Sequence, residues 1–193
     1  VDDGSRDETL DRARAAAARA PEIRVLSNGT NRGKGFSVRH GMLAARGTAR
    51  FFSDADLSTP IEECDTLEPW LARGFDVVIA SRALGGSRVE VHQAWPREHM
   101  GKVFNWIVQA LACPGLHDTQ CGFKAFSARA AADMFPLAEF DGFSFDVELL
   151  WLARRLRYRI REVPVRWINS PATKVDAMRD SMRMFRDVCR LRW

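Results

Sequence analysis

The sequence predicts a single α/β domain with a doubly wound, mostly parallel sheet flanked by helices, and three observations lead to this prediction. Short apolar segments alternate with longer segments of helical pattern along the 193 residues. The chain is 46% hydrophobic and 28% charged, a composition typical of a globular domain. Acidic residues directly follow one apolar strand pattern, and in such sheets ligands bind beyond the carboxyl ends of the strands.

The first half of the chain is expected to contain three helices and three strands. Gly47 and Gly74 follow the second and third helical patterns, as is common at helix C-termini, and Pro60 suits the first turn of the third. The strand patterns are short, apolar and rich in β-branched or aromatic residues. The expected helices are residues 7–19, 34–45 and 60–73, and the expected strands are residues 23–26, 49–53 and 75–80.

The second half begins with a polar segment, residues 82–92, and then returns to alternating elements. The expected helices are residues 97–112, 128–134, 145–155 and 175–193, and the expected strand regions are residues 123–126 and 158–167. We divide the chain into one catalytic domain, residues 1–174, and a basic amphipathic C-terminal helix, residues 175–193.

Composition excludes several classes of protein. The longest apolar stretch, residues 103–116, is interrupted by polar residues and falls short of the about 20 residues that a membrane-spanning helix needs. The four cysteines form no CxxC pair, which favours reduced thiols in a cytosolic setting over a zinc site. Nucleic-acid binding is disfavoured because basic and aromatic residues are not interleaved.

The C-terminal helix suggests an anionic partner. Residues 151–193 hold twelve Arg or Lys against four Asp or Glu, although the whole chain carries a net charge of only +4. The apolar positions with helical spacing are Val175, Met178, Met182, Phe185, Val188, Cys189 and Leu191. Such a helix can lie on a lipid surface, or it can pack on the core with a solvated arginine face; both interpretations stay open.

Asp54 and Asp56 are the main candidates for chemistry. On a strand, two residues one apart project from the same face, so we expect both carboxylates to reach one ion. They could hold Mg²⁺ or Mn²⁺ while a substrate diphosphate fills other coordination positions. The alternative is a pair of solvated loop acids, because a single Asp-x-Asp motif is a weak signal.

Two further loops carry polar residues at positions typical of nucleotide sites. Asp2 and Asp3 begin an Asp-Asp-Gly-Ser segment, where an acid can hydrogen-bond a ribose or base. Asn31 begins an Asn-Arg-Gly-Lys-Gly loop that opens a helix, and its Lys34 is placed to reach a phosphate. The alternatives are a helix cap for the first segment and an ordinary turn for the second.

Two more motifs follow along the chain: Ser81-Arg82 and the Asp-Thr-Gln-Cys-Gly-Phe-Lys block at residues 118–124. Taken in order, all these motifs resemble those of the family-2 inverting glycosyltransferases that act on polyprenyl phosphates. The dolichyl-phosphate glucosyltransferase branch is most similar, because of Arg97-x-x-Met-Gly-x-x-Phe-Asn and the block that starts at Asp118. Dolichyl-phosphate mannosyltransferases are similar as well and remain competitors.

The resemblance implies a GT-A fold, a nucleotide-sugar donor (UDP-glucose, or alternatively GDP-mannose) and a polyprenyl phosphate acceptor at the cytoplasmic face of a membrane. The family normally begins with a strand and a Pro-x-Tyr-Asn-Glu-like segment, so we expect the first strand to be missing and the domain to be truncated. A non-catalytic nucleotide-sugar or lipid-phosphate binding module is the alternative of another class. A Rossmann oxidoreductase is disfavoured because no G-x-G-x-x-G opens a helix.

The resemblance also implies roles for individual residues. The implied nucleotide-sugar ligands are Asp2, Asp3, Asn31, Lys34, Asp54 and Asp56. The implied metal ligands are Asp54, Asp56 and Ser58. The implied catalytic residues are Arg82, Arg97 and Asp118, and the implied acceptor contacts are Arg82, Arg97, Lys124 and Phe143, although Lys124 could equally be a surface lysine.

Asp118 could act as a general base or as an orienting group. A phosphomonoester has a second pKa of about 6 and is already largely ionised near neutral pH, so it has little need of a base. We therefore expect Asp118 to orient the acceptor or the sugar hydroxyls.

Overall fold

The computed structural model describes residues 1–90, 106, 108–109, 112–168 and 177–191. Arg97 and the helix expected over residues 97–112 therefore fall largely or wholly outside the described residues. Within the described part of the chain, no helix is both long enough and apolar enough to cross a membrane.

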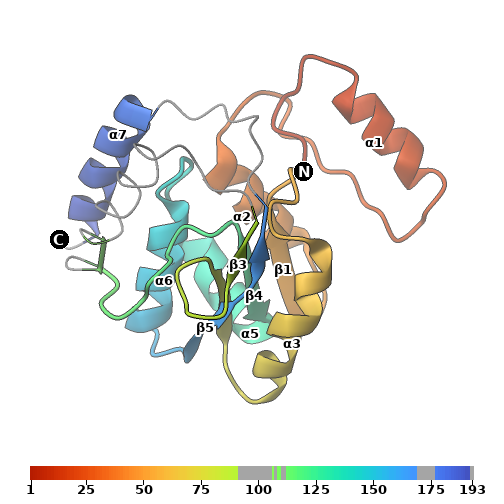
Figure 1. Ribbon diagram of the computed structural model, residues 1–193. Helices are drawn as coiled ribbons and strands as arrows, with labels where there is room; N and C mark the ends of the chain where they lie inside the picture. The colour runs from red at the N-terminus through yellow and green to blue at the C-terminus, as the bar shows by residue number, and fades with distance from the viewer. Residues whose placement is uncertain (91–105, 107, 110–111, 169–176, 192–193) are drawn as a thin grey trace.

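The central sheet has four strands in the order β1-β4-β2-β5 (Figure 1). The strands are β1 (Ala49–Ser53), β2 (Val77–Ser81), β4 (Phe123–Ser127) and β5 (Ile160–Pro164). β2 pairs in parallel with β5, whereas β4 pairs antiparallel with both β1 and β2. Three strands thus share one direction, as expected, but the reversed β4 between them makes the sheet mixed.

The reversal of β4 brings three chain segments to one edge of the sheet. The carboxyl ends of β1 and β2 lie beside the amino end of β4, because Ser53 pairs with Phe123 and Ile79 pairs with Lys124. Residues after β1, after β2 and before β4 therefore meet at this edge, which is where a functional site is expected.

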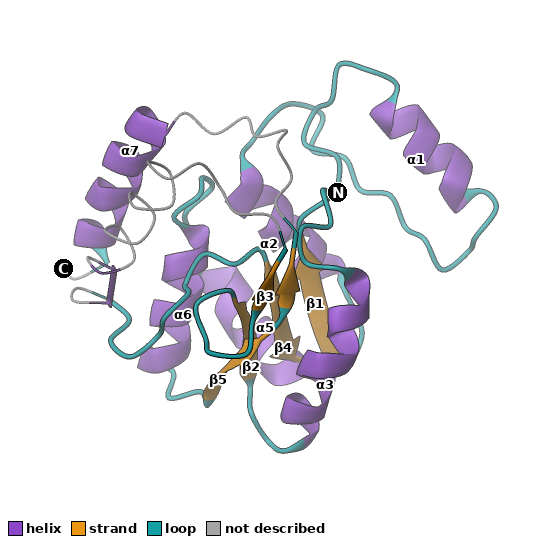
Figure 2. Ribbon diagram, in the orientation of Figure 1, coloured by secondary structure: helices purple, strands orange, loops and turns teal. Residues whose placement is uncertain are grey.

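Helices cover both faces of the sheet (Figure 2). The helical segments are α1 (Thr9–Ala17), α2 (Lys34–Ala44), η1 (Ile61–Glu63), α3 (Cys64–Ala72), α5 (Ala128–Met134), η2 (Phe135–Leu137), α6 (Phe145–Arg155) and α7 (Ala177–Arg190). One core cluster joins β2 to α2, α5, α6 and α7, and a second joins the opposite face of the sheet to α3. Along β2, Val77 and Ile79 enter the first cluster and Val78 and Ala80 enter the second, which explains why residues 77–80 are all apolar.

Two strand predictions need correction. The strand expected over residues 23–26 does not form; Ile23 is 47% exposed, and this region pairs only through a single bridge between Asp2 and Ser27. The strand region expected over residues 158–167 divides at Pro164 into β5 and the short β6 (Arg166–Trp167), which pairs with β3 (Arg88–Val89). Proline has no N–H for the ladder, so a strand commonly ends there.

The expected stripe on α7 is also arranged differently. Met184, Val188 and Leu191 are buried in the first core cluster, whereas Met182 is 66% exposed and Phe185 is 48% exposed. The helix therefore packs on the core with one face and presents apolar side chains on another.

Candidate active site

Asp54 and Asp56 lie in a tight turn directly after β1, not on the strand. The backbone N–H of Leu57 donates to the Asp54 carbonyl at 3.1 Å, and Leu57 has a positive φ of 51°. The expectation that strand alternation places both carboxylates on one face is therefore wrong. The turn brings them to the same place, at the mouth of a cavity of about 540 Å³ that both residues line.

Lys34, the first residue of α2, lines the same cavity and forms an ion pair with Asp54. Its Nζ lies 2.6 Å from Asp54 Oδ1, and about a third of each side chain is exposed. Burial alone would lower the pKa of Lys34, but the carboxylates of Asp146, Asp54 and Asp56 raise it. The lysine therefore remains charged and acts as a cation beside the two aspartates.

Asp54 is held tightly against the loop that precedes β4. Its backbone N–H donates to the Gly122 carbonyl at 3.0 Å. A Cβ atom at position 122 would lie 2.0 Å from Asp54 Oδ2, so only glycine leaves room for this carboxylate. The Asp-Thr-Gln-Cys-Gly block thus shapes the aspartate site through its backbone.

The donor set fits a hard divalent cation. Two carboxylates at an open cavity are suited to an ion that completes its coordination with substrate phosphates. Among the described residues, no group of three or more His, Cys, Asp or Glu side chains is arranged to hold a metal ion, so a closed all-protein metal site is absent from that part of the chain. Ser58 is buried and its N–H donates to Asp56 Oδ1 at 2.9 Å, which fixes the second aspartate.

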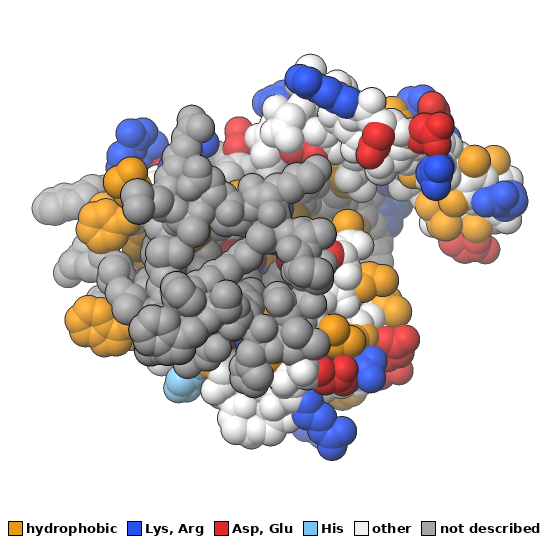
Figure 3. Space-filling view, turned by 45° about the horizontal axis from the view of Figure 1, so that its top comes forward, with side chains coloured by type: hydrophobic (Ala, Val, Ile, Leu, Met, Phe, Trp, Pro, Cys, Tyr) orange, Lys and Arg blue, Asp and Glu red, His pale blue; other side chains and the backbone are white. Residues whose placement is uncertain are grey.

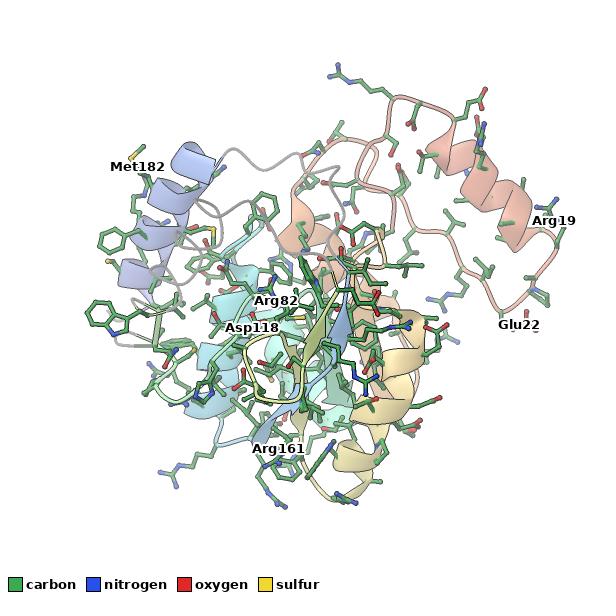
Figure 4. All side chains as sticks on the ribbon, in the orientation of Figure 1. Arg19, Glu22, Arg82, Asp118, Arg161 and Met182 are labelled. Carbon is green, nitrogen blue, oxygen red and sulfur yellow. The ribbon has the colours of Figure 1, made fainter. Side chains whose placement is uncertain are left out.

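Arg82, one residue beyond β2, forms a two-pronged ion pair with Asp118 at the same edge of the sheet (Figure 4). Arg82 Nε donates to Asp118 Oδ2 at 2.7 Å, Nη2 donates to Oδ1 at 2.8 Å, and the Arg82 N–H donates to Oδ2 at 2.9 Å. Burial would raise the pKa of Asp118, but Arg82 lowers it below the ordinary value. A carboxylate held in this way is a weak base, which supports the expected orienting role.

Glu162 on β5 fixes the position of Asp118. Its carboxylate accepts the Asp118 N–H at 2.7 Å and the His117 N–H at 2.9 Å. Sequence reasoning missed this residue. The available signal was a single acid in a strand region whose other charged residues are arginines, because a buried glutamate seldom lacks a partner.

Lys124 is fully buried, so the alternative of a surface lysine is wrong. Its Nζ donates to the Cys121 carbonyl at 2.7 Å and forms an ion pair with Asp146. Both partners are protein groups, so the structure does not bring Lys124 into direct contact with the open cavity. Asp146, in the first turn of α6, was not identified from the sequence, and it lies under the site with 3% of its surface exposed.

The Asp-Asp-Gly-Ser segment is joined to the Asn-Arg-Gly-Lys-Gly loop. Asp3 accepts hydrogen bonds from the N–H groups of Arg32 and Gly33 at 2.8 and 2.9 Å and from the side chain of Asn28 at 2.8 Å. Asp2 is buried and accepts from Ser27 Oγ at 3.3 Å. These bonds give both aspartates a part in holding the loop that precedes Lys34.

The first turn of α2 has fewer backbone N–H groups available to a phosphate than expected. The N–H groups of Gly35 and Phe36 donate to the Asp141 carbonyl at 2.8 and 3.3 Å, so these helix N-terminal donors are already used. Lys34 is then the group of this loop that faces the cavity, while Asn31 is exposed. Phe143 is half-buried and packs against the first core cluster.

Comparisons with known proteins agree with this arrangement. The Glycosyl transferase family 2 profile matches residues 1–135. The chain is 34% identical over 200 residues to a dolichyl-phosphate beta-glucosyltransferase of Dictyostelium discoideum, a match that covers 100% of this chain and 61% of the relative. It is 36% identical over 196 residues to the protein of the same name from Drosophila melanogaster, with 97% of this chain and 60% of the relative covered.

Solved structures support the fold. Glucosyl-3-phosphoglycerate synthase from Mycobacterium tuberculosis, in complex with phosphoglyceric acid, superposes with a TM-score of 0.68 at 19% identity and covers 99% of this chain and 66% of that chain. The same enzyme in complex with Mn²⁺ and UDP-glucose superposes with a TM-score of 0.62 at 20% identity, over 97% of this chain and 66% of that chain. The predicted GT-A glycosyltransferase fold is confirmed by these neighbours.

Proposed function

Because this chain belongs to glycosyl transferase family 2, we propose that it transfers glucose from UDP-glucose, with inversion, to a dolichyl or related polyprenyl phosphate. The chain spans about 60% of the length of the first curated relatives it matches, which are dolichyl-phosphate beta-glucosyltransferases. One observation carries the proposal. The loop at residues 118–122 joins the Lys34–Asp54 pair to the Arg82–Asp118 pair at a single edge of the sheet.

Each pair suits one substrate. Asp54 and Asp56 would hold Mg²⁺ or Mn²⁺, which when bound neutralises charge on the departing nucleoside diphosphate. Lys34 lines the same cavity and supplies a further positive charge toward the diphosphate. Arg82 carries a guanidinium fork, which matches phosphate oxygens well and suits the acceptor phosphate.

The reaction requires little proton transfer. An oxygen of the ionised acceptor phosphate forms the new bond to the anomeric carbon as the bond to the nucleoside diphosphate breaks, so an α-linked donor gives a β-linked product. Asp118 keeps the Arg82 guanidinium in position through its two side-chain bonds. This role requires the carboxylate to remain ionised, in agreement with its lowered pKa.

A donor comparison tests the proposal. The protein is incubated with a short polyprenyl phosphate, Mn²⁺ and either UDP-glucose or GDP-mannose, and the lipid product is measured. We expect transfer from UDP-glucose. Preferred transfer from GDP-mannose would make the protein a mannosyltransferase, and binding of nucleotide without transfer from either donor would favour a non-catalytic module.

We also propose that α7 docks on the cytoplasmic surface of an anionic membrane, where the lipid acceptor resides. Its outer surface presents Met182 and Phe185, and on the side of the molecule where α7 lies separate hydrophobic side chains face outward, with basic side chains nearby (Figure 3). Among the described side chains of this helix, the exposed arginines are Arg183, Arg186 and Arg190. Basic residues beside an apolar face add about 1 kcal/mol each near an anionic surface.

Liposome flotation tests the docking surface. Deleting α7 is a poor test, because Met184 and Val188 belong to the core. Met182→Ser/Phe185→Ser leaves those contacts in place and should reduce flotation with phosphatidylserine vesicles about tenfold. Flotation equal to that of the unchanged protein would exclude this surface.

A further inference from the structure

The buried charges under the cavity form a connected series. Lys34 pairs with Asp54 at 2.6 Å, and Asp146 pairs with Lys124 behind it. Among the carboxylates that raise the pKa of Lys34, Asp146 has the largest Coulombic effect, ahead of Asp54. The Lys34 ammonium thus lies within the influence of two acids, one at the cavity and one beneath it.

The backbone around Lys34 is fixed, so only its side chain has freedom to move. A Cβ atom at position 35 would lie 2.1 Å from the Phe140 carbonyl oxygen and 2.7 Å from Phe145 Cβ, which shows how closely the first turn of α2 packs against the first turn of α6. Lys34 Nζ lies 5.7 Å from the centre of the Phe145 ring. Asp146 follows Phe145 in that turn, and its Coulombic influence on Lys34 agrees with a position beneath the lysine.

A cation at the aspartates would compete directly with Lys34. The ammonium and a metal ion cannot share Asp54 Oδ1 at a contact of 2.6 Å without strong repulsion. The lysine then needs another partner. Asp146 is placed to supply one, because it lies beneath the same site, beside Lys124, and its charge already acts on Lys34.

We infer that Lys34 exchanges its partner when a divalent cation binds: it leaves Asp54, and Asp146 holds it at the rim of the cavity. Asp146 is thus a positioning residue that acts on the cation site through Lys34. The inference rests on the cation site of the proposed function, but not on the identity of the sugar or the acceptor.

Mn²⁺ binding to the protein alone tests this exchange. The resonance of free Mn²⁺ is followed by electron paramagnetic resonance, without nucleotide or lipid, for the unchanged chain, Lys34→Met, Asp146→Asn and the double variant. Lys34→Met should raise the Mn²⁺ affinity about tenfold, because it removes the competing ammonium. Asp146→Asn should lower the affinity about fivefold when Lys34 is present and less than about twofold when it is absent.

Two controls separate this effect from general electrostatics and from misfolding. Arg32→Gln removes a positive charge from the same loop and should change the affinity less than about twofold. Asp146→Asn leaves the buried Lys124 without its acid and could unfold the protein. If circular dichroism shows unfolding, the double variant Asp146→Asn/Lys124→Met, which removes both charges, is used in place of Asp146→Asn.

The outcomes are distinct. The inference is overturned if Lys34→Met has the same Mn²⁺ affinity as the unchanged chain or a lower one. It is also overturned if Asp146→Asn changes the Mn²⁺ affinity by the same factor with and without Lys34. Absence of Mn²⁺ binding to the unchanged chain at millimolar concentration overturns it together with the cation site. The expected pattern without any glucosyl transfer would sustain the exchange and refute only the proposed reaction.

Discussion

Replacing Gly122 by alanine perturbs the aspartate site without touching a functional side chain. The new Cβ would lie 2.0 Å from Asp54 Oδ2 and 2.3 Å from Asp54 Cγ, whereas real Cβ contacts essentially never fall below 3.0 Å. The Asp54 carboxylate must therefore move by at least about 1 Å, and a displacement of that size can cost about 100-fold in rate. Gly122 does not have a positive φ, so alanine fits the backbone conformation.

The assay compares kcat for transfer from UDP-glucose with the melting temperature. We expect Gly122→Ala to lower kcat about 100-fold, because the Asp54 carboxylate is displaced from the cation site. Gly85→Ala is the matched control, since a Cβ there meets nothing within 4 Å and its kcat should be unchanged. A folded Gly122→Ala protein with kcat within about twofold of the unchanged chain would refute the assignment of Asp54 to the reaction.

Three further results are expected. Asp118→Asn should retain more activity than Asp56→Ala, because an orienting amide still accepts from Arg82; the reverse order in turnover assays would restore the general-base role. Burial would raise the pKa of Asp118, but Arg82 holds this pKa below its usual value. The ion pair therefore stabilises the fold at pH values above the unfolded pKa of about 3.9, and this stabilisation is lost as the pH falls toward the folded pKa. Urea unfolding should therefore show Asp118→Asn to be less stable than the unchanged protein by ~1–3 kcal/mol at pH 7, and this difference should shrink below about pH 4. The magnitude is reduced from that of a fully buried ion pair because the Arg82 side chain is partly exposed. Leu67→Ala, at the fully buried residue of α3, should cost ~2–5 kcal/mol of unfolding free energy in the same experiment and leave the KM for UDP-glucose unchanged.

The sequence pattern correctly predicted the helices and strands whose formation depends mainly on their own residues and caps. The helix over residues 145–155 was placed correctly, and the helix expected from residue 128 begins there because Ser127 accepts the Ala130 N–H as an N-cap. The strand over residues 49–53 was also placed correctly. The reversal of β4 was not predicted, because it depends on how the long connection after β2 returns to the sheet and not on the residues of β4 itself.

The sequence predicted the residues at the sheet edge of the candidate site but not the charged residues buried beneath it. Asp54, Lys34, Arg82 and Asp118 all lie at the expected edge of the sheet, since sequence motifs report residues near strand ends. Asp146 and Lys124 could not be identified in this way. Lysine and aspartate are rarely buried, so a sequence pattern assigns them to the surface unless a partner distant in the chain is known.

The buried groups change how the charge of the site is understood. Five carboxylates and three cations meet at this edge of the sheet within the described residues, namely Asp54, Asp56, Asp118, Asp146 and Glu162 with Lys34, Arg82 and Lys124. The surplus of two negative charges disfavours a bare nucleoside diphosphate, and a divalent cation at the aspartates would neutralise it. The donor should therefore bind with or after the cation, and the Lys34 ammonium, released from Asp54 and held by Asp146, would then face the diphosphate.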